Sequence, residues 1–263
     1  MTNTSKETDQ AKSQEQSDAQ PLVQHLIELR TRILHSLLAV LIIFLGLFSF
    51  SNDIWNFVGA PLIDILPNGS MIATNITSTF LTPFKLTLFA ATFLAMPYIL
   101  WQIWNFIAPA LYTKEKKFAM PLFISSVLLF YAGVAFAYYV IFPLIFLFFT
   151  NTAPDQVAVT PDIASHLTLV IKLFFAFGLA FEIPVATVLL ISAGIVSVDG
   201  MASKRRYVVV GCFILGMLLT PPDIISQALL AIPMWILFET GIFFGRIVVK
   251  GRQQDEAESE SEA

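Results

Sequence analysis

The residues best able to do chemistry in this sequence are three glutamates, of which Glu182 lies deepest in an apolar stretch. Burial of an ionisable side chain in lipid is unfavourable, so such a residue is a functional candidate by default. Lys172 precedes it by ten residues, about 15 Å along a helix and on another face, and does not neutralise it. We therefore expect Glu182 to face protein or water, or to be protonated. The alternative is a neutral glutamate that bonds across helices for packing.

The other two glutamates, Glu28 and Glu115, lie among basic residues beside apolar stretches. Glu28 belongs to PLVQHLIELRTRI, whose apolar residues repeat at helical spacing and predict an amphipathic interfacial helix. Carboxylates of restricted geometry suit a site that reads guanidinium groups, because arginine offers paired donors. The alternatives are an i,i+4 pair of Glu28 with Arg32 and, for Glu115, a solvated loop charge between lysines. On the residues alone we favour these alternatives.

Motifs of catalysis are missing from the sequence. The three histidines form no HExxH pattern, and we find no GxSxG, P-loop or dinucleotide-binding glycine pattern. The single cysteine, Cys212, forms no intrachain disulfide and no CxxC pattern. We expect no enzymatic activity, no cofactor and no metal, although pattern alone leaves open an intramembrane protease with dispersed residues.

Composition places the glutamates in a membrane protein. The 263 residues are 56% hydrophobic and 13% charged, and include 25 Phe, whereas a soluble domain carries roughly 25% charged residues. A membrane-spanning helix needs about 20 residues. Six apolar stretches are candidates: Ile33–Asn52, Lys85–Ala108, Met120–Phe149, His166–Val196, Tyr207–Pro222 and Ile224–Gly245. The fifth would reach only about 24 Å as a helix, which suggests a locally thinned bilayer.

The distribution of basic residues predicts the topology. All of the 15 Lys and Arg except Lys85 and Lys172 precede span one, follow span six, or lie between spans two and three or four and five. Basic residues in short loops mark the cytoplasmic side, so we predict six spans with both termini cytoplasmic. Prolines inside four spans predict a bent bundle, with spans five and six short or kinked: Pro97, Pro143, Pro184 and Pro233.

Two polar tails flank the apolar region. Residues 1–20 and the acidic segment 253–263 are predicted to be disordered and cytoplasmic, and residues 21–252 to form one six-helix transmembrane domain. Two further function classes fit such a chain, namely a secondary transporter for a small solute and a passive membrane scaffold. Spans one to three show no similarity to spans four to six, which argues against the transporter.

Several motifs follow one another in a characteristic order: HLIELR at residues 25–30, APL at 60–62, FIAPAL at 106–111 followed by Glu115, FEIP at 181–184, and LTPPD at 219–223 followed by Gln227. In this order, from about Pro21 to Arg252, the sequence resembles the TatC family, the large integral subunit of the twin-arginine protein translocase. The resemblance implies an all-α cupped bundle of six helices in the bacterial cytoplasmic (inner) membrane, in agreement with the topology predicted from charge.

The resemblance also implies a function. A TatC-like protein would bind the signal peptides of folded proteins, which carry consecutive arginines, and would export these proteins with the single-span subunits TatA and TatB. The proton-motive force would supply the energy, the protein would self-associate in a larger complex, and no nucleic acid would take part. With the resemblance in view, we favour arginine recognition at Glu28 and Glu115.

The family's functional positions match nine residues of this sequence. Glu28 and Glu115 would read the arginines, with Arg30 and Phe106 lining the same cytoplasmic patch. Five other residues would serve signal insertion, partner contact or transport: Pro61, Tyr138, Glu182, Asp223 and Gln227.

Overall fold

The structure, a computed structural model, describes residues 4–63, 71–111, 116–152, 161–219 and 224–261. Over these ranges the regular structure is helical, apart from an isolated parallel bridge between Ile72 and Asp162. The all-α class is thereby confirmed. The elements are α1 (Thr4–Leu47), η1 (Phe48–Phe50), α2 (Ser51–Ile63), α3 (Ile76–Leu94), α4 (Met96–Leu111), α5 (Lys116–Phe136), η2 (Ala137–Ile141), α6 (Phe142–Thr152), α7 (Ile163–Ala180), α8 (Ile183–Ser192), α9 (Val198–Ser203), α10 (Arg205–Leu219) and α11 (Ile224–Ser261).

Most of the expected spans have a counterpart of membrane-crossing length. Four helical runs are long and apolar enough, namely Leu26–Ala60, Met120–Thr152, Ile163–Ser192 and Ile224–Gly251, and α3 with α4 forms a fifth run bent by 50°. The expected fifth span corresponds to α10, whose 15 residues reach only about 22 Å. Among the described residues α10 does not meet the length of a full span, so the count of six stays a prediction.

Regular α-helix is interrupted beside three of the four prolines that we expected to cause bends. The α3–α4 break precedes Pro97, the π-helical turn η2 precedes Pro143, and the α7–α8 break precedes Pro184. A proline removes a backbone hydrogen bond and clashes with the preceding turn, which explains where these breaks fall. By contrast, α11 runs through Pro233 as one helix.

A side chain from a neighbouring helix supports one of these breaks. The Tyr131 hydroxyl on α5 donates to the Phe93 carbonyl, at 3.0 Å. Phe93 lies four residues before Pro97, so its carbonyl is the one that loses its regular helical donor. A neighbouring helix thus satisfies a polar group that lipid could not.

The core of the bundle lies where α5, η2 and α6 pack on α7. Ile141, Phe142, Ile145, Leu173 and Phe177 are fully buried there. A Cβ atom on Gly133 of α5 would overlap the backbone of Phe177. Small residues at helix crossings let the backbones of membrane helices approach closely, and this crossing follows that rule.

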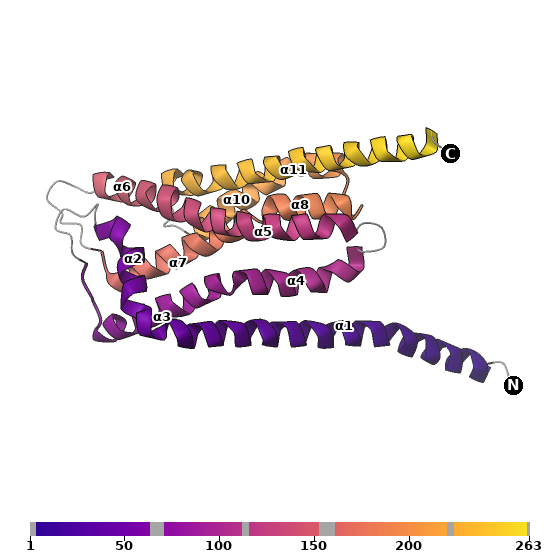
Figure 1. Cartoon of the computed structure of the whole chain (residues 1–263), viewed down its shortest axis with the longest axis horizontal. Helices are drawn as coiled ribbons and strands as arrows, with labels where there is room; N and C mark the ends of the chain where they lie inside the picture. The colour runs from indigo at the N-terminus through magenta and orange to yellow at the C-terminus, as the bar shows by residue number, and fades with distance from the viewer. Residues whose placement is uncertain (1–3, 64–70, 112–115, 153–160, 220–223, 262–263) are drawn as a thin grey trace.

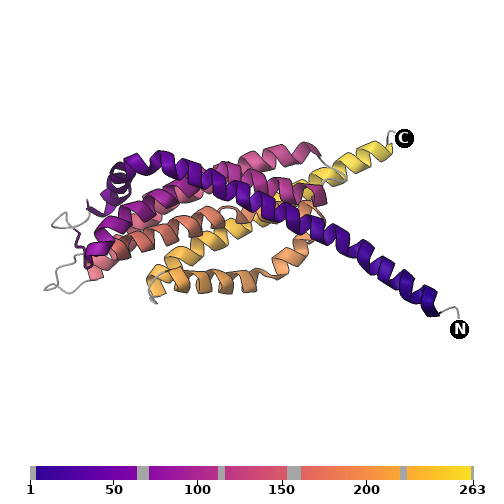
Figure 2. The same ribbon diagram turned by 90° about the horizontal axis from the view of Figure 1, so that it is seen from below.

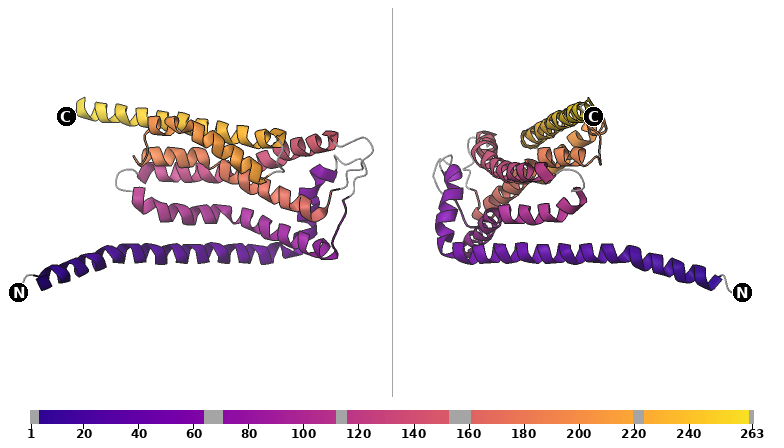
Figure 3. Two further views of the ribbon diagram at one scale, coloured as in Figure 1. Left: turned by 180° about the vertical axis from the view of Figure 1, so that it is seen from behind. Right: turned by 45° about the vertical axis from the view of Figure 1, so that its right-hand side comes forward.

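Helix α1 lies at the outside of the bundle. It packs on α3 and α4, while Leu37, Leu41 and Leu45 on its other face are exposed. Figure 2 shows α1 running across the front of the remaining helices, and Figure 3 shows α1 and α11 on opposite sides of the bundle. The exposed apolar face of α1 is therefore suited to contact with lipid.

Both chain ends lie at the same end of the bundle (Figure 1). In the structure α1 begins at Thr4 and α11 continues to Ser261, and the disorder of the two tails stays a prediction. Lys, Glu, Gln and Ala, which are frequent in these segments, have high helix propensity, and extending an existing helix avoids the cost of a new nucleus. The division into two tails and one transmembrane domain stays a prediction.

Candidate functional site

Glu28 forms an ion pair with Arg32 one turn further along α1. The Arg32 Nε donates to Glu28 Oε1 at 3.0 Å, and Nη2 donates to the same oxygen. The Glu28 side chain is 40% exposed and the Arg32 side chain is 22% exposed, so the pair lies partly within the protein. The i,i+4 alternative for Glu28 is therefore present in the structure.

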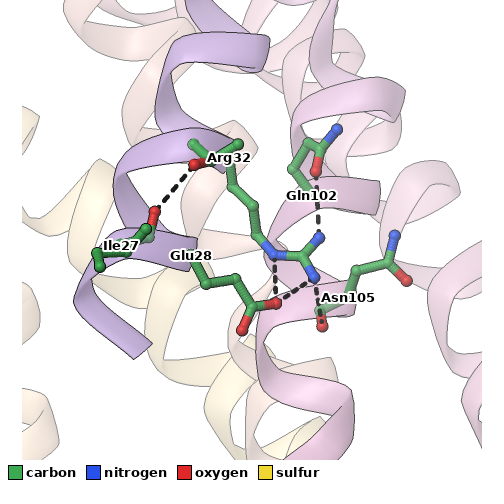
Figure 4. Close-up of polar contacts among 6 residues, drawn as sticks. Ile27, Glu28, Arg32, Gln102 and Asn105 are labelled. Atoms are coloured by element: carbon green, nitrogen blue, oxygen red, sulfur yellow. Dashed lines mark hydrogen bonds and ion pairs between the residues drawn. The ribbon is translucent and has the colours of Figure 1, made fainter. Parts of the chain in front are cut away.

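Arg32 also connects α1 to α4. Its Nη1 donates to Gln102 Oε1, and its Nη2 donates to the backbone carbonyl of Asn105, each at 3.2 Å. Figure 4 shows the Arg32 guanidinium between the Glu28 carboxylate and these two residues. Gln102 and Asn105 were not among the predicted site residues. Their spacing could have predicted this role. They are polar, lie three positions apart in the apolar run MPYILWQIWNF and therefore share one helix face.

The remaining residues of the expected cytoplasmic patch are only partly brought together. Phe106 lies on α4 directly after Asn105 and is half-buried. Arg30 is exposed on α1 and, at about 200° around the helix from Glu28, lies on a different face. Glu115 lies outside the described residues. The structure thus brings Glu28 next to the helix that carries Phe106, and the role of the four residues as a patch stays a prediction.

A second ion pair at this end of the bundle joins α10 to α11. Arg205 Nε lies 2.7 Å from Glu239 Oε1, and Nη2 donates to Oε2 at 2.8 Å. Both carboxylate oxygens of Glu239 are therefore engaged by one guanidinium, in the bidentate arrangement typical of arginine.

Glu182 lies at the break between α7 and α8, facing α5. Its Oε2 accepts a hydrogen bond from Ser126 Oγ at 2.6 Å. Its Oε1 is buried and has no hydrogen-bond partner within the part of the chain that the structure describes. Lys172 is exposed on α7. The bond across helices that the packing alternative required is present, and it uses one of the two oxygens.

The residues expected to serve insertion, partner contact or transport fall in separate places. The Tyr138 hydroxyl in η2 donates to the Phe57 carbonyl on α2 at 2.7 Å, and the two rings stack with centroids 5.3 Å apart. Gln227 Nε2 on α11 donates to the Phe213 carbonyl on α10 at 2.7 Å. Pro61 belongs to α2, and Asp223 lies outside the described residues.

Asp162, which was not among the predicted site residues, joins the segment before α3 to the start of α7. Its carboxylate accepts from the N–H and hydroxyl of Thr74, at 3.1 and 2.8 Å, and from the N–H and hydroxyl of Ser165. These bonds, with that of the Thr74 N–H foremost, hold the pKa of Asp162 well below its usual range. The segment before α3 is thereby fixed to the start of α7.

Within the described ranges, no group of three or more His, Cys, Asp or Glu residues is placed to hold a metal ion. The contacts described above are hydrogen bonds and ion pairs of carboxylates, guanidinium groups, amides and hydroxyls.

Comparison with known proteins gives consistent results. The family described as "Sec-independent protein translocase protein (TatC)" matches residues 24–233. The TatC protein of Azotobacter chroococcum mcd 1 is 60% identical over 86% of this chain and 89% of its own. That of Escherichia coli (strain K12) is 57% identical over 91% and 93%, respectively.

A solved structure supports the same relation. The crystal structure described as the twin-arginine translocase receptor TatC superposes with a TM-score of 0.78 at 36% identity. It covers 86% of this chain and 99% of its own. The similarity therefore extends to the fold as well as the sequence.

Proposed function

The chain belongs to the TatC family, and from this premise we propose that it is the receptor that binds twin-arginine signal peptides at the cytoplasmic face of the membrane. It is a multi-pass membrane protein and a component of a Sec-independent protein translocase. This assignment replaces the alternatives of a solute transporter and a passive scaffold.

The observation that carries the proposal is the guanidinium bound to Glu28. The Glu28 carboxylate already accepts two N–H groups from Arg32, which also contacts α4. The chemistry that holds Arg32 is the chemistry that would hold an arginine of a signal peptide. Glu115 would supply a second carboxylate, with Arg30 and Phe106 on the adjoining surface.

The proposal includes the assembly in which the receptor works. The protein lies in the bacterial inner membrane with six spans and with both termini, tails included, in the cytoplasm. It self-associates and acts with TatA and TatB, and the proton-motive force drives export of the folded protein. It catalyses no chemical reaction of its own. The common end of the two termini in Figure 1 supports an even number of crossings.

Five residues would act after the signal has bound. Glu182 has an unpartnered buried oxygen among the described atoms, which favours contact with a polar group of an inserted signal or partner helix. Gln227 joins α10 to α11 and Tyr138 joins η2 to α2, so both support surfaces that a partner could contact. Pro61 and Asp223 are included on family resemblance alone.

Signal-peptide crosslinking tests the proposal directly. We expect Glu28→Ala or Glu115→Ala to abolish crosslinking of a twin-arginine signal peptide while the protein level is unchanged, because each removes a carboxylate that an arginine would require. Glu239→Ala is the matched control: it also removes a carboxylate paired with an arginine, and crosslinking should persist. Unaltered crosslinking in both the Glu28 and Glu115 variants would contradict the assignment.

A further inference from the structure

Arg32 is held by groups on two helices. Besides the two bonds to Glu28, its guanidinium donates to the Gln102 side chain and to the Asn105 carbonyl, both on α4. The two bonds to α4 do not involve Glu28, so they would hold the guanidinium in place whatever else approached the carboxylate. An arginine offers five donors in a rigid planar fork, and this site uses the fork to span two helices.

The pairing leaves one oxygen of Glu28 unused. Both donors of Arg32 end on Oε1, and in the described chain no hydrogen bond to Oε2 is present. Figure 4 shows the second oxygen turned away from the guanidinium. The Arg205–Glu239 pair differs, because there one arginine engages both oxygens. Of these two ion pairs, only the one at Glu28 leaves a carboxylate oxygen without a donor among the described residues.

We propose that Arg32 is a positioning residue, which α4 anchors and which fixes the Glu28 carboxylate so that Oε2 accepts an arginine of the signal peptide. The inference rests on the proposed function, since it assumes that Glu28 is the acceptor. Without Arg32 the carboxylate would turn freely about its side-chain bonds, and binding would carry the entropy cost of ordering it. Arg32 also occupies Oε1 of Glu28, so a signal arginine would approach the carboxylate from the side of Oε2.

A competing interpretation makes Arg32 an internal competitor that must leave before a signal arginine binds. The two interpretations predict opposite signs. Removing a competitor would tighten signal binding, whereas removing a positioning residue would weaken it. The anchoring of Arg32 on α4 favours positioning, because an arginine that had to leave would lose those two bonds as well.

The test is the affinity of the purified full-length protein in lipid nanodiscs for a synthetic twin-arginine signal peptide. We expect Arg32→Gln to weaken binding about tenfold or more, because a charge-assisted contact is lost. Arg32→Lys should not restore affinity, since an ammonium group does not reproduce the fork. Arg205→Gln, at the fully paired Glu239, is the matched control and should bind as the unaltered protein does.

A double-mutant cycle separates positioning from a merely structural role. With Glu28→Gln in place, Arg32→Gln should cause no further loss, because its effect passes through the carboxylate. Additive losses, or tighter binding by Arg32→Gln, would overturn the inference while leaving the proposed function intact. Unchanged binding by Glu28→Gln would instead overturn the proposed function and, with it, the inference.

If Arg32→Gln lowers the melting temperature of the protein, a milder variant tests the positioning role of Arg32. Gln102→Ala removes one anchor and leaves the Glu28–Arg32 pair, so we expect about a threefold weaker affinity at an unchanged melting temperature. An affinity equal to that of the unaltered protein would overturn the inference.

Discussion

Glu28 and Glu182 are both glutamates with one engaged oxygen, but their partners differ in chemistry. Glu28 accepts from a guanidinium at the end of the bundle, and Glu182 accepts from a serine hydroxyl within it. A guanidinium always carries charge, whereas a hydroxyl can donate to a carboxylate or to a neutral carboxylic acid. Glu28 is therefore suited to a cationic ligand, and Glu182 to a polar group that enters the membrane.

Substitution at Glu182 should separate transport from recognition. We expect Glu182→Ala to lower the rate of export about fivefold or more, because a hydrogen bond to an incoming polar group is lost. Glu182→Gln keeps a polar side chain and should retain most of the rate. The measurement is export of a folded reporter, with signal binding, which should be unchanged, assayed in parallel.

Lys172→Ala is the control for this pair of variants, because Lys172 is exposed on the same apolar run. Its export should equal that of the unaltered protein. Normal export by both Glu182 variants would exclude the proposed role of this side chain.

From the sequence, the contact that could be anticipated as an alternative is a local one. Arg32 lies four positions from Glu28, so helix periodicity alone predicts that they can pair, and the pair is present. Gln102, Asn105 and the Thr74–Asp162 contact were missed, because they join segments 70 or more residues apart. The spacing of residues along one helix does not predict which face of another helix those residues contact.

At the scale of helices, close packing depends on glycines, which have no side chain. A Cβ at Gly133 of α5 would overlap the Phe177 carbonyl of α7, and one at Gly241 of α11 would lie 2.9 Å from the Pro184 Cα of α8. These helices touch through their backbones, so neither neighbour can yield by a rotamer change. The two crossings fix the half of the bundle that carries Glu182.

We expect Gly133→Ala to lower the free energy of unfolding by roughly 1–3 kcal/mol, the usual effect of overpacking. The measurement is unfolding in mixed detergent micelles followed by circular dichroism. Gly46→Ala on α1 is the matched control, because a Cβ there has no neighbour within 4 Å and alanine raises helix propensity. Equal stability of the two variants would show that the α5–α7 crossing can relax.

The positions of the bends were predictable, and the extent of the helices was not. Pro97, Pro143 and Pro184 each lie just after an interruption of regular α-helix, because a proline inside a helix removes a backbone hydrogen bond and clashes with the preceding turn. Pro233 does not end α11, and the polar segments after Thr4 and before Ser261 continue as helix. Low hydrophobicity predicts that a segment does not pack, and such a segment can still continue a helix that begins elsewhere.

At the scale of the whole molecule, the described polar contacts form two groups. The first is the ion pairs of Arg32 on α1 and Arg205 on α10, and the second is the contacts of Asp162 with Thr74 and Ser165, before α3 and at the start of α7. The charge asymmetry of the sequence predicts that the first group faces the cytoplasm, and this orientation stays a prediction.

Thiol labelling in intact cells tests that orientation. Ala73→Cys, before α3, should react with a membrane-impermeant maleimide added outside the inner membrane, and Ser203→Cys, at the end of α9, should react only after the membrane is opened. The unaltered protein is the control, because Cys212 is buried. The reverse pattern, or labelling of both variants from outside, would refute the predicted topology.

The hydrogen bonds of Arg32 on α1 to residues of α4 affect when, during synthesis, the receptor can bind a signal. Arg32 and Asn105 are 73 residues apart, and chains are synthesised from the N-terminus at about 5–20 residues per second. For several seconds after Glu28 leaves the ribosome, the groups that anchor Arg32 do not yet exist. A nascent or truncated chain that ends before α4 therefore has the Glu28 carboxylate but not its fixed geometry. The ability to bind a signal would then show that the first helices have inserted and assembled.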